Sequence, residues 1–219
     1  MNASGPDGGR TPPGNPFSTG ADGGTVRLSL LALAVALIAA HPASAHIMKS
    51  EAGGFLSGLH HPISGWDHIL AMVAVGIWGA QLGAPAMWLL PVTFPVVMAL
   101  GGMLGLIGVP LPGAEIGIAL SALLLGIMVL AEARPPLWVA AVLVGVFAIF
   151  HGYAHGTELP EGESGLLYSL GFVVATGGLH AVGITIGLIH RWMVGRRLLQ
   201  FCGAIIAAGG VYFLMGALG

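Results

Sequence analysis

The sequence predicts an all-α integral membrane protein, a six-helix bundle that follows a cleaved N-terminal signal peptide. Of its 219 residues, 56% are hydrophobic and 7% are charged, whereas soluble domains carry about 25% charged residues. Its apolar segments approach the length of about 20 residues that a bilayer-spanning helix needs. Its 37 glycines are typical of helices that pack closely in lipid.

Charge and cysteine content exclude other classes of protein. The formal net charge of -2 disfavours binding to nucleic acid, which depends on basic side chains. Cys202 is the only cysteine, so the chain has neither a disulfide framework nor a cysteine-based zinc site.

The N-terminal region predicts two segments ahead of the membrane domain. Residues 1–25 are rich in Gly, Pro, Ser and Thr, which indicates a disordered leader or a misassigned start, with Val26 as the alternative initiator. Arg27, an apolar run over 28–40 and Ala43-Ser44-Ala45 are typical of a signal peptide, here over 26–45. Cleavage after Ala45 would leave His46 as the mature N-terminus, and an uncleaved helix is the alternative.

The remaining residues, 46–219, form the predicted six-helix transmembrane domain. Its apolar segments cover about residues 65–83, 86–109, 114–132, 136–154, 165–189 and 198–217. Short turns marked by glycine or proline separate them, as expected where one helix ends and the next begins.

The basic residues predict the orientation of this domain. With the mature N-terminus outside, the outer side carries only Lys49, and the inner loops carry Arg134, Arg191, Arg196 and Arg197. This is the bias that the positive-inside rule expects. We therefore expect a multi-pass protein of the bacterial inner membrane with both ends of the mature chain in the periplasm.

Two polar clusters interrupt the apolar segments, and this topology brings them to one membrane level. The outer start of the first segment holds His60, His61, Asp67 and His68. The outer end of the fourth holds His151, His155 and Glu158, and the outer start of the third holds Glu115. Ionisable groups inside a membrane are costly and generally have a function.

Helical spacing predicts how these side chains are arranged. His151 and His155 are separated by one turn and share a face, and Glu158 follows near that face if the helix continues. Pro62 predicts that the first helix begins after His61. Asp67 and His68 point about 100° apart, so that one of them can face the interior while the other orients it.

Imidazoles with carboxylates predict a site for a divalent first-row transition metal. Nickel, cobalt and zinc all accept such ligands, and the residue types do not rank them. An all-oxygen Mg²⁺ site is disfavoured by the number of histidines. For the isolated His180 and His190, a hydrogen bond to a neighbouring helix is expected, with His180 as a candidate ligand on the exit side.

Three other functions remain open from the residues. Histidines on two membrane helices could bind a b-type haem of an electron carrier. A metal sensor or chaperone would need the same ligands without transport. An intramembrane metalloenzyme is disfavoured because the sequence has no H-E-x-x-H motif.

Two long motifs resemble the HupE/UreJ family. The first is His61-Pro62-x-x-Gly65-x-Asp67-His68, followed by the run from Ala71 to Trp78, and the second runs from Phe150 to Glu158. Family members are small membrane proteins, often with a cleaved signal and six helices. They are described as nickel or cobalt permeases that are associated with hydrogenase or urease genes.

The resemblance implies both a function and a set of residues. It implies secondary, ATP-independent transport of Ni²⁺ into the cytoplasm for hydrogenase or urease maturation, with a cobalt or zinc permease as the alternative. The protein would then be no enzyme and hold no permanent cofactor; its partners would be the metal ion and membrane lipid, with a homo-oligomer left open. The family's important positions fall on His61, Asp67, His68, Phe94, Glu115, His151, His155 and Glu158. Phe94 cannot bind a metal and would pack beside the path or gate it, while His46 and His60 would attract the ion outside.

Overall fold

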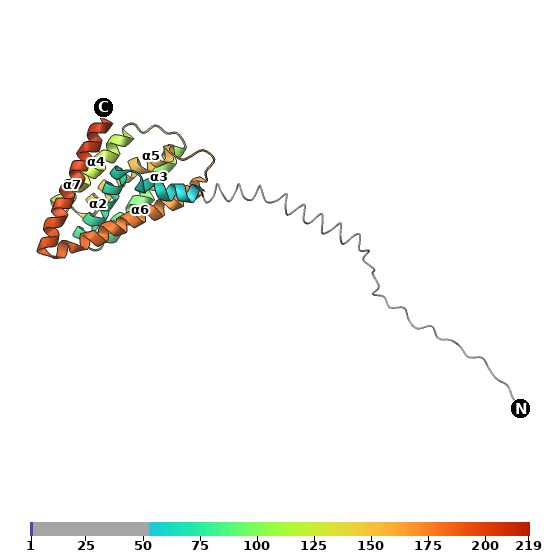
Figure 1. Cartoon of the computed structure of the whole chain (residues 1–219), viewed down its shortest axis with the longest axis horizontal. Helices are drawn as coiled ribbons and strands as arrows, with labels where there is room; N and C mark the ends of the chain where they lie inside the picture. Colours follow the sequence, from blue (N-terminus) through green and yellow to red (C-terminus); the bar gives the residue numbers. More distant parts are fainter. Residues whose placement is uncertain (2–52) are drawn as a thin grey trace. The chain divides into compact units, whose positions relative to one another are not determined.

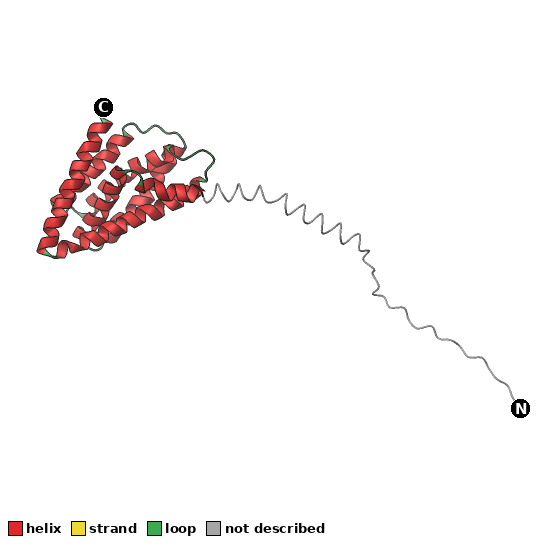
Figure 2. Cartoon of the chain, viewed as in Figure 1, coloured by secondary structure: helices red, strands yellow, loops and turns green. Residues whose placement is uncertain are grey.

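The structure is a computed structural model that describes residues 53–219 together with Met1. In this part of the chain all regular structure is helical, and it contains no strand (Figure 2). The predicted leader, the predicted signal peptide and His46 fall within residues 2–52, outside the described residues.

The described chain consists of helices joined by short turns (Figure 1). Residues 53–60 are helical. They are followed by the 3-10 helix η1 (His61–Ile63), α2 (Trp66–Leu82), α3 (Ala86–Leu106), α4 (Ala114–Leu130), α5 (Leu137–Thr157), α6 (Gly165–Gly187), the 3-10 helix η2 (Leu188–Arg191) and α7 (Met193–Ala217). Each helix from α2 to α7 lies on one predicted segment. The largest difference is at α7, which begins at Met193 rather than at residue 198 and includes two arginines in its first turns.

Length and composition mark four or five of these helices as able to cross a membrane. Four qualify alone, namely α3, α5, α6 with η2, and α7. The helix Gly53–Ile63 and α2 qualify together as a bent pair, and α4, with 17 residues, is apolar but shorter than the four helices that qualify alone. The helical, apolar character is therefore confirmed, whereas six membrane spans stay a prediction.

The start of the first helix differs from the sequence prediction. The first helix was expected to begin after His61, at Pro62, but residues 53–60 are already helical and the chain bends by 77° before α2. Pro62 sits in the first turn of η1, where a missing N–H is tolerated. Gly65 then adopts an extended conformation ahead of Trp66. The bend separates His61 from His68 and lets both face the same interior.

Glycines bring the helices together in three main pairs, α3 with α5, α4 with α7, and α2 with α6. Gly152 lies against the carbonyl of Met98, and Gly101 lies against the carbonyl of Ile149, so that a Cβ on either glycine would collide with backbone. Gly183 packs in the same way on α2. These contacts are the close packing that small residues permit in membranes, and they hold α5 and α6 in a fixed register around the histidines.

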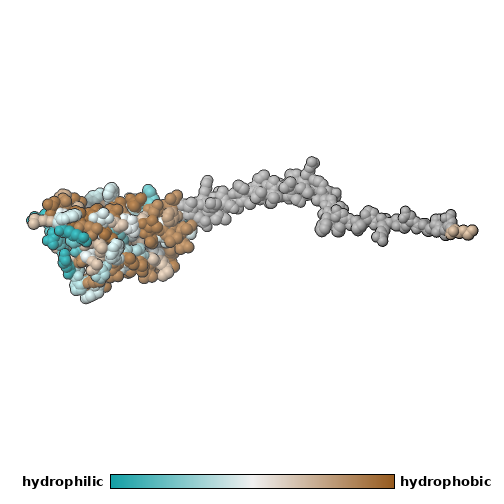
Figure 3. Space-filling model, turned by 90° about the horizontal axis from the view of Figure 1, so that it is seen from below, coloured by the Kyte–Doolittle hydropathy of each residue, from teal (hydrophilic) through white to brown (hydrophobic). Residues whose placement is uncertain are grey.

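The polarity of the molecule is inverted relative to a soluble protein. Trp88, Val92 and Phe201 are more than half exposed, while His151 and His180 are buried. Figure 3 shows apolar side chains over most of the visible helical surface. An apolar exterior around buried imidazoles is the arrangement expected of a protein surrounded by lipid.

Candidate metal site

Four imidazoles form a continuous row inside the helical bundle. The ring centroids of His61 and His155 are 4.7 Å apart, those of His155 and His68 are 4.7 Å apart, and those of His68 and His151 are 4.9 Å apart. These residues come from η1, α2 and α5. The two histidine clusters, far apart in sequence, therefore meet as the predicted topology requires.

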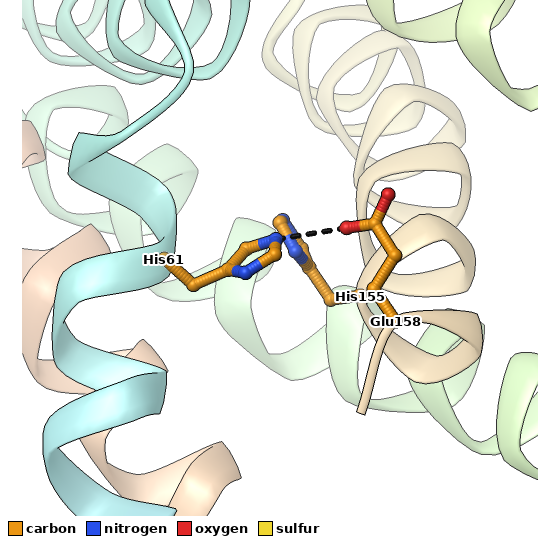
Figure 4. A group of neighbouring side chains, drawn as sticks. All are labelled: His61, His155 and Glu158. Atoms are coloured by element: carbon orange, nitrogen blue, oxygen red, sulfur yellow. Dashed lines mark ion pairs between the residues drawn. The ribbon is translucent and has the colours of Figure 1, made fainter. Parts of the chain in front are cut away.

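The outer end of the row is a group of two imidazoles and a carboxylate (Figure 4). His61 Nε2 lies 2.8 Å from Glu158 Oε2. One ligand atom from each of His61, His155 and Glu158 can be chosen so that all lie within 4.8 Å of one another. Because α5 ends at Thr157, Glu158 is its C-cap residue, and its side chain reaches η1. His155 is buried and Glu158 is exposed, so this group opens outward.

The inner end of the row consists of His68 and His151, and each has one ring nitrogen held by the protein. Asp67 Oδ1 accepts a hydrogen bond from the His68 backbone N–H and lies 2.9 Å from His68 Nδ1. His151 Nδ1 lies 3.0 Å from the carbonyl oxygen of Phe147. A proton on each Nδ1 leaves Nε2 with a free lone pair, as in metal-binding histidines that are oriented by a carboxylate or a carbonyl. Asp67 thus contacts Nδ1 of His68, and its role in orienting a metal ligand stays a prediction.

The remaining ring nitrogens have no hydrogen-bond partner within the described residues. They are the Nε2 atoms of His68 and His151 and both ring nitrogens of His155. A buried polar atom without a partner costs about 1–3 kcal/mol. Nitrogen ligands with nearby carboxylate oxygens suit a borderline divalent ion, which would satisfy these lone pairs.

A hollow beside the row collects the acidic groups. Its lining includes Asp67, His68, Glu115 and Glu158, together with Tyr212 of α7. Glu115 is exposed in the first turn of α4, so it lies at the mouth and outside the row of imidazoles. Carboxylates that line a concave surface attract cations, and the mouth is therefore suited to capture.

Other sequence-predicted residues lie outside the row. His60 is exposed, and its Nδ1 lies 2.9 Å from the Ser64 hydroxyl. His190 Nδ1 lies 2.9 Å from the Gly187 carbonyl, a local hydrogen bond and not the expected bond to a neighbouring helix. His180 has no hydrogen-bond partner within the part of the chain described, although the Pro91 carbonyl of the neighbouring helix α3 lies beside its ring.

Phe94 stands between the row and His180. Its side chain is fully buried, and its ring centroid lies 5.3 Å from that of His151 and 5.3 Å from that of His180. The ring belongs to α3, whereas the two histidines belong to α5 and α6. Phe94 therefore touches the inner end of the row, and the role beside an ion path that the resemblance implies for it stays a prediction.

One wall of the site, on α6, was not predicted from the sequence. Tyr168 lies 6.0 Å from His61, and Phe172 lies 4.0 Å from His155, measured between ring centroids. Together with Thr176 and His180 they are buried residues at four-residue spacing on α6, and thus on one helix face. That spacing, which ends on a histidine, is the signal that could have identified the wall.

Comparisons with known proteins agree with this architecture. A family described as HupE / UreJ protein matches residues 33–213. The chain is similar to Protein HupE of Rhizobium leguminosarum bv. viciae, with 43% identity over 191 residues, which cover 87% of this chain and 97% of that protein. No solved structure matches the chain. The family match and the extent of this identity establish that the chain belongs to the HupE/UreJ family.

Proposed function

We propose that this protein is a permease that carries a divalent transition-metal ion, foremost Ni²⁺, across the bacterial inner membrane into the cytoplasm. The observation that carries the proposal is the row of imidazoles from the acidic mouth to the buried interior. Membership of the HupE/UreJ family supports it, since the motifs resemble those of metal permeases.

The graded exposure of the ligands favours transport over storage. Relative exposure is 55% at Glu158 and 32% at His61, whereas His155, His68 and His151 are only 5%, 13% and 0% exposed. Neighbouring imidazoles are in contact, so that an ion can take up the next ligand before it leaves the last one. Conduction needs sites of this kind, which bind well enough to admit an ion and weakly enough to release it.

The ligand chemistry supports Ni²⁺ without excluding Co²⁺ or Zn²⁺. Nitrogen and oxygen donors are what these borderline ions accept, and Cys202, the only thiol of the chain, lies on α7 outside the row. The preference for nickel, and a role in supplying hydrogenase or urease, rest on the family resemblance.

The membrane potential is the proposed driving force. The sequence contains no nucleotide-binding motif, which favours a channel-like or secondary mechanism. An inside-negative potential favours inward movement of a divalent cation by about 4.6 kcal/mol per 100 mV, from 2.3 kcal/mol for each charge. A potential of this size drives uptake without a coupled ion.

The haem alternative fits the geometry less well. The imidazoles contact one another directly, at centroid separations of 4.7–4.9 Å, and an axially coordinated haem would need the macrocycle between two of them. The purified protein should therefore show no Soret band.

Reconstitution tests the proposed function. The full chain in vesicles with an entrapped metal-sensitive dye should take up Ni²⁺, and uptake should be faster with an inside-negative potential than without one. Parallel assays with Co²⁺ and Zn²⁺ rank the ions. Binding without flux would indicate a sensor or chaperone and contradict the permease, and empty vesicles are the control.

A further inference from the structure

A second group of buried polar atoms lies on the far side of Phe94 from the imidazole row. His180 is 1% exposed, and neither of its ring nitrogens has a hydrogen-bond partner within the described residues. Its ring lies 5.3 Å from that of Phe94, which lies at the same distance from His151. His180 is thus separated from the row by one aromatic ring, and its two nitrogens are unsatisfied.

Thr176 adds a hydroxyl to the same group. It precedes His180 by one helical turn, so the two side chains share a face of α6. The side chain is fully buried, and Oγ1 has no partner within the described residues. Hydroxyl side chains in helices commonly donate a hydrogen bond to the backbone carbonyl one turn earlier, as Thr185 does to Ala181 in the same helix. Thr176 does not form this bond, and its hydroxyl is therefore available to a ligand.

The backbone of α3 supplies another oxygen. Pro91 and Pro95 both lie inside α3, and Pro95 has no N–H to donate to the Pro91 carbonyl one turn earlier. That carbonyl lies beside the His180 ring, outside hydrogen-bond geometry. A helix carbonyl released by a proline needs another partner inside a membrane.

We propose that His180, Thr176 and the Pro91 carbonyl form an inner metal station, which receives a divalent cation that has passed Phe94. This inference rests on the proposed function and extends it, because it divides the path into an outer row and an inner station with Phe94 as the partition. One imidazole with neutral oxygens is a weaker ligand set than the outer row of imidazoles, and it suits release toward the cytoplasm.

Two readouts on the full chain separate the inner station from the outer row. Equilibrium binding of Ni²⁺ to purified protein reports the outer row, and flux into vesicles reports the whole path. His180→Ala should keep Ni²⁺ binding within about twofold and lower uptake at least about tenfold, the scale of losing a metal-supporting group. Thr176→Val, nearly isosteric, should lower uptake about threefold.

Matched controls and a ligand swap distinguish coordination from packing. His190→Ala and Thr185→Val, which remove groups with local hydrogen bonds near or on α6, should keep both readouts at the wild-type level. In a Cys202→Ala background, His180→Cys should raise the uptake ratio of Cd²⁺ to Ni²⁺ about tenfold, because a thiolate favours softer ions. A purely structural His180 would not shift that ratio.

The possible results distinguish failure of the inner station from failure of the proposed function. Wild-type uptake in His180→Ala, or an unchanged Cd²⁺ to Ni²⁺ ratio in His180→Cys, would overturn the inner station while leaving the permease intact. If His180→Ala fails to fold, the ratio in His180→Cys and the flux through Thr176→Val decide instead. Wild-type protein that binds Ni²⁺ but gives no flux would refute the proposed function itself, and the inner station with it.

Discussion

Asp67 controls which nitrogen His68 presents to the path. One carboxylate oxygen holds both the backbone N–H and Nδ1 of His68, and this leaves Nε2 free. The Phe147 carbonyl does the same for His151. The orienting partners are therefore as much a part of the site as the imidazoles.

We predict that Asp67→Asn weakens Ni²⁺ binding about 10- to 100-fold, the usual cost of losing a group that orients a metal ligand. The amide keeps the volume of the carboxylate but loses its charge. Isothermal titration of the purified protein measures the change. Glu161→Gln, the same replacement at an exposed loop position, should bind within about twofold of wild type, and an equal loss in both variants would contradict the orienting role.

The imidazole row also predicts how uptake depends on pH. A neutral imidazole binds metal and a protonated one does not, so protons compete with a metal ion for imidazole ligands. Initial uptake at constant free Ni²⁺ should therefore fall as the outer pH is lowered from about 7.5 to about 5 and recover when it is raised. Uptake that increases toward acid would argue for proton-coupled transport and against simple ligand competition.

At the scale of the elements, the packing of α5 on α3 fixes where the histidines point. Gly152 and Gly156 lie against the Met98 and Gly102 carbonyls of α3. They alternate along α5 with His151 and His155, whose side chains consequently face the interior. The close contact of these glycines with α3 fixes the rotation of α5, and the rotation fixes the direction of its histidine side chains.

Gly152→Ala should consequently lower stability, by about 1–3 kcal/mol as for other overpacked contacts. A Cβ there would collide with the Met98 carbonyl, and backbone moves only with its whole helix. Gly178→Ala is the matched control, because its Cβ would enter open space and alanine favours helix by up to about 1 kcal/mol. Thermal unfolding in detergent compares them, and equal midpoints would be inconsistent with close α3–α5 packing.

Helix positions followed from the sequence because long apolar runs end at glycine or proline. The bend between His61 and Trp66 could not be predicted, because Pro62 indicates that a helix starts there but not that another helix precedes it. The meeting of His61 and His68 with His151 and His155 was predictable from topology alone. Their order along the row, and the wall formed by Tyr168 and Phe172, depend on helix rotation and packing, which periodicity does not encode.

At the scale of the whole described domain, acidic and basic residues lie at opposite ends of α7. Glu158 and the C-terminal end of α7, including Met215 and Ala217, line the same hollow. The exposed Arg191 and Arg197 lie near the opposite end of α7. The acidic hollow and these arginines thus lie at opposite ends of the domain. The positive-inside rule expects the end that carries the arginines to face the cytoplasm.

This polarity predicts which residues are accessible from outside the cell. In a Cys202→Ala background, Gly219→Cys should react with a membrane-impermeant thiol reagent applied to spheroplasts, and Arg197→Cys should react only after the membrane is opened. Mass tagging of the purified protein measures both. The reverse pattern would place the acidic mouth in the cytoplasm and contradict uptake.

The central claim is that the imidazole row is the route of the ion, and His155, which contacts both His61 and His68, is the residue on which the row depends. The most direct test is Ni²⁺ flux into vesicles that contain equal amounts of wild type, His155→Ala and His190→Ala, each checked for folding. We expect His155→Ala to lower flux at least about tenfold, while His190→Ala, which lies outside the row, transports like wild type. Wild-type flux through folded His155→Ala would show that the ion does not pass along the row.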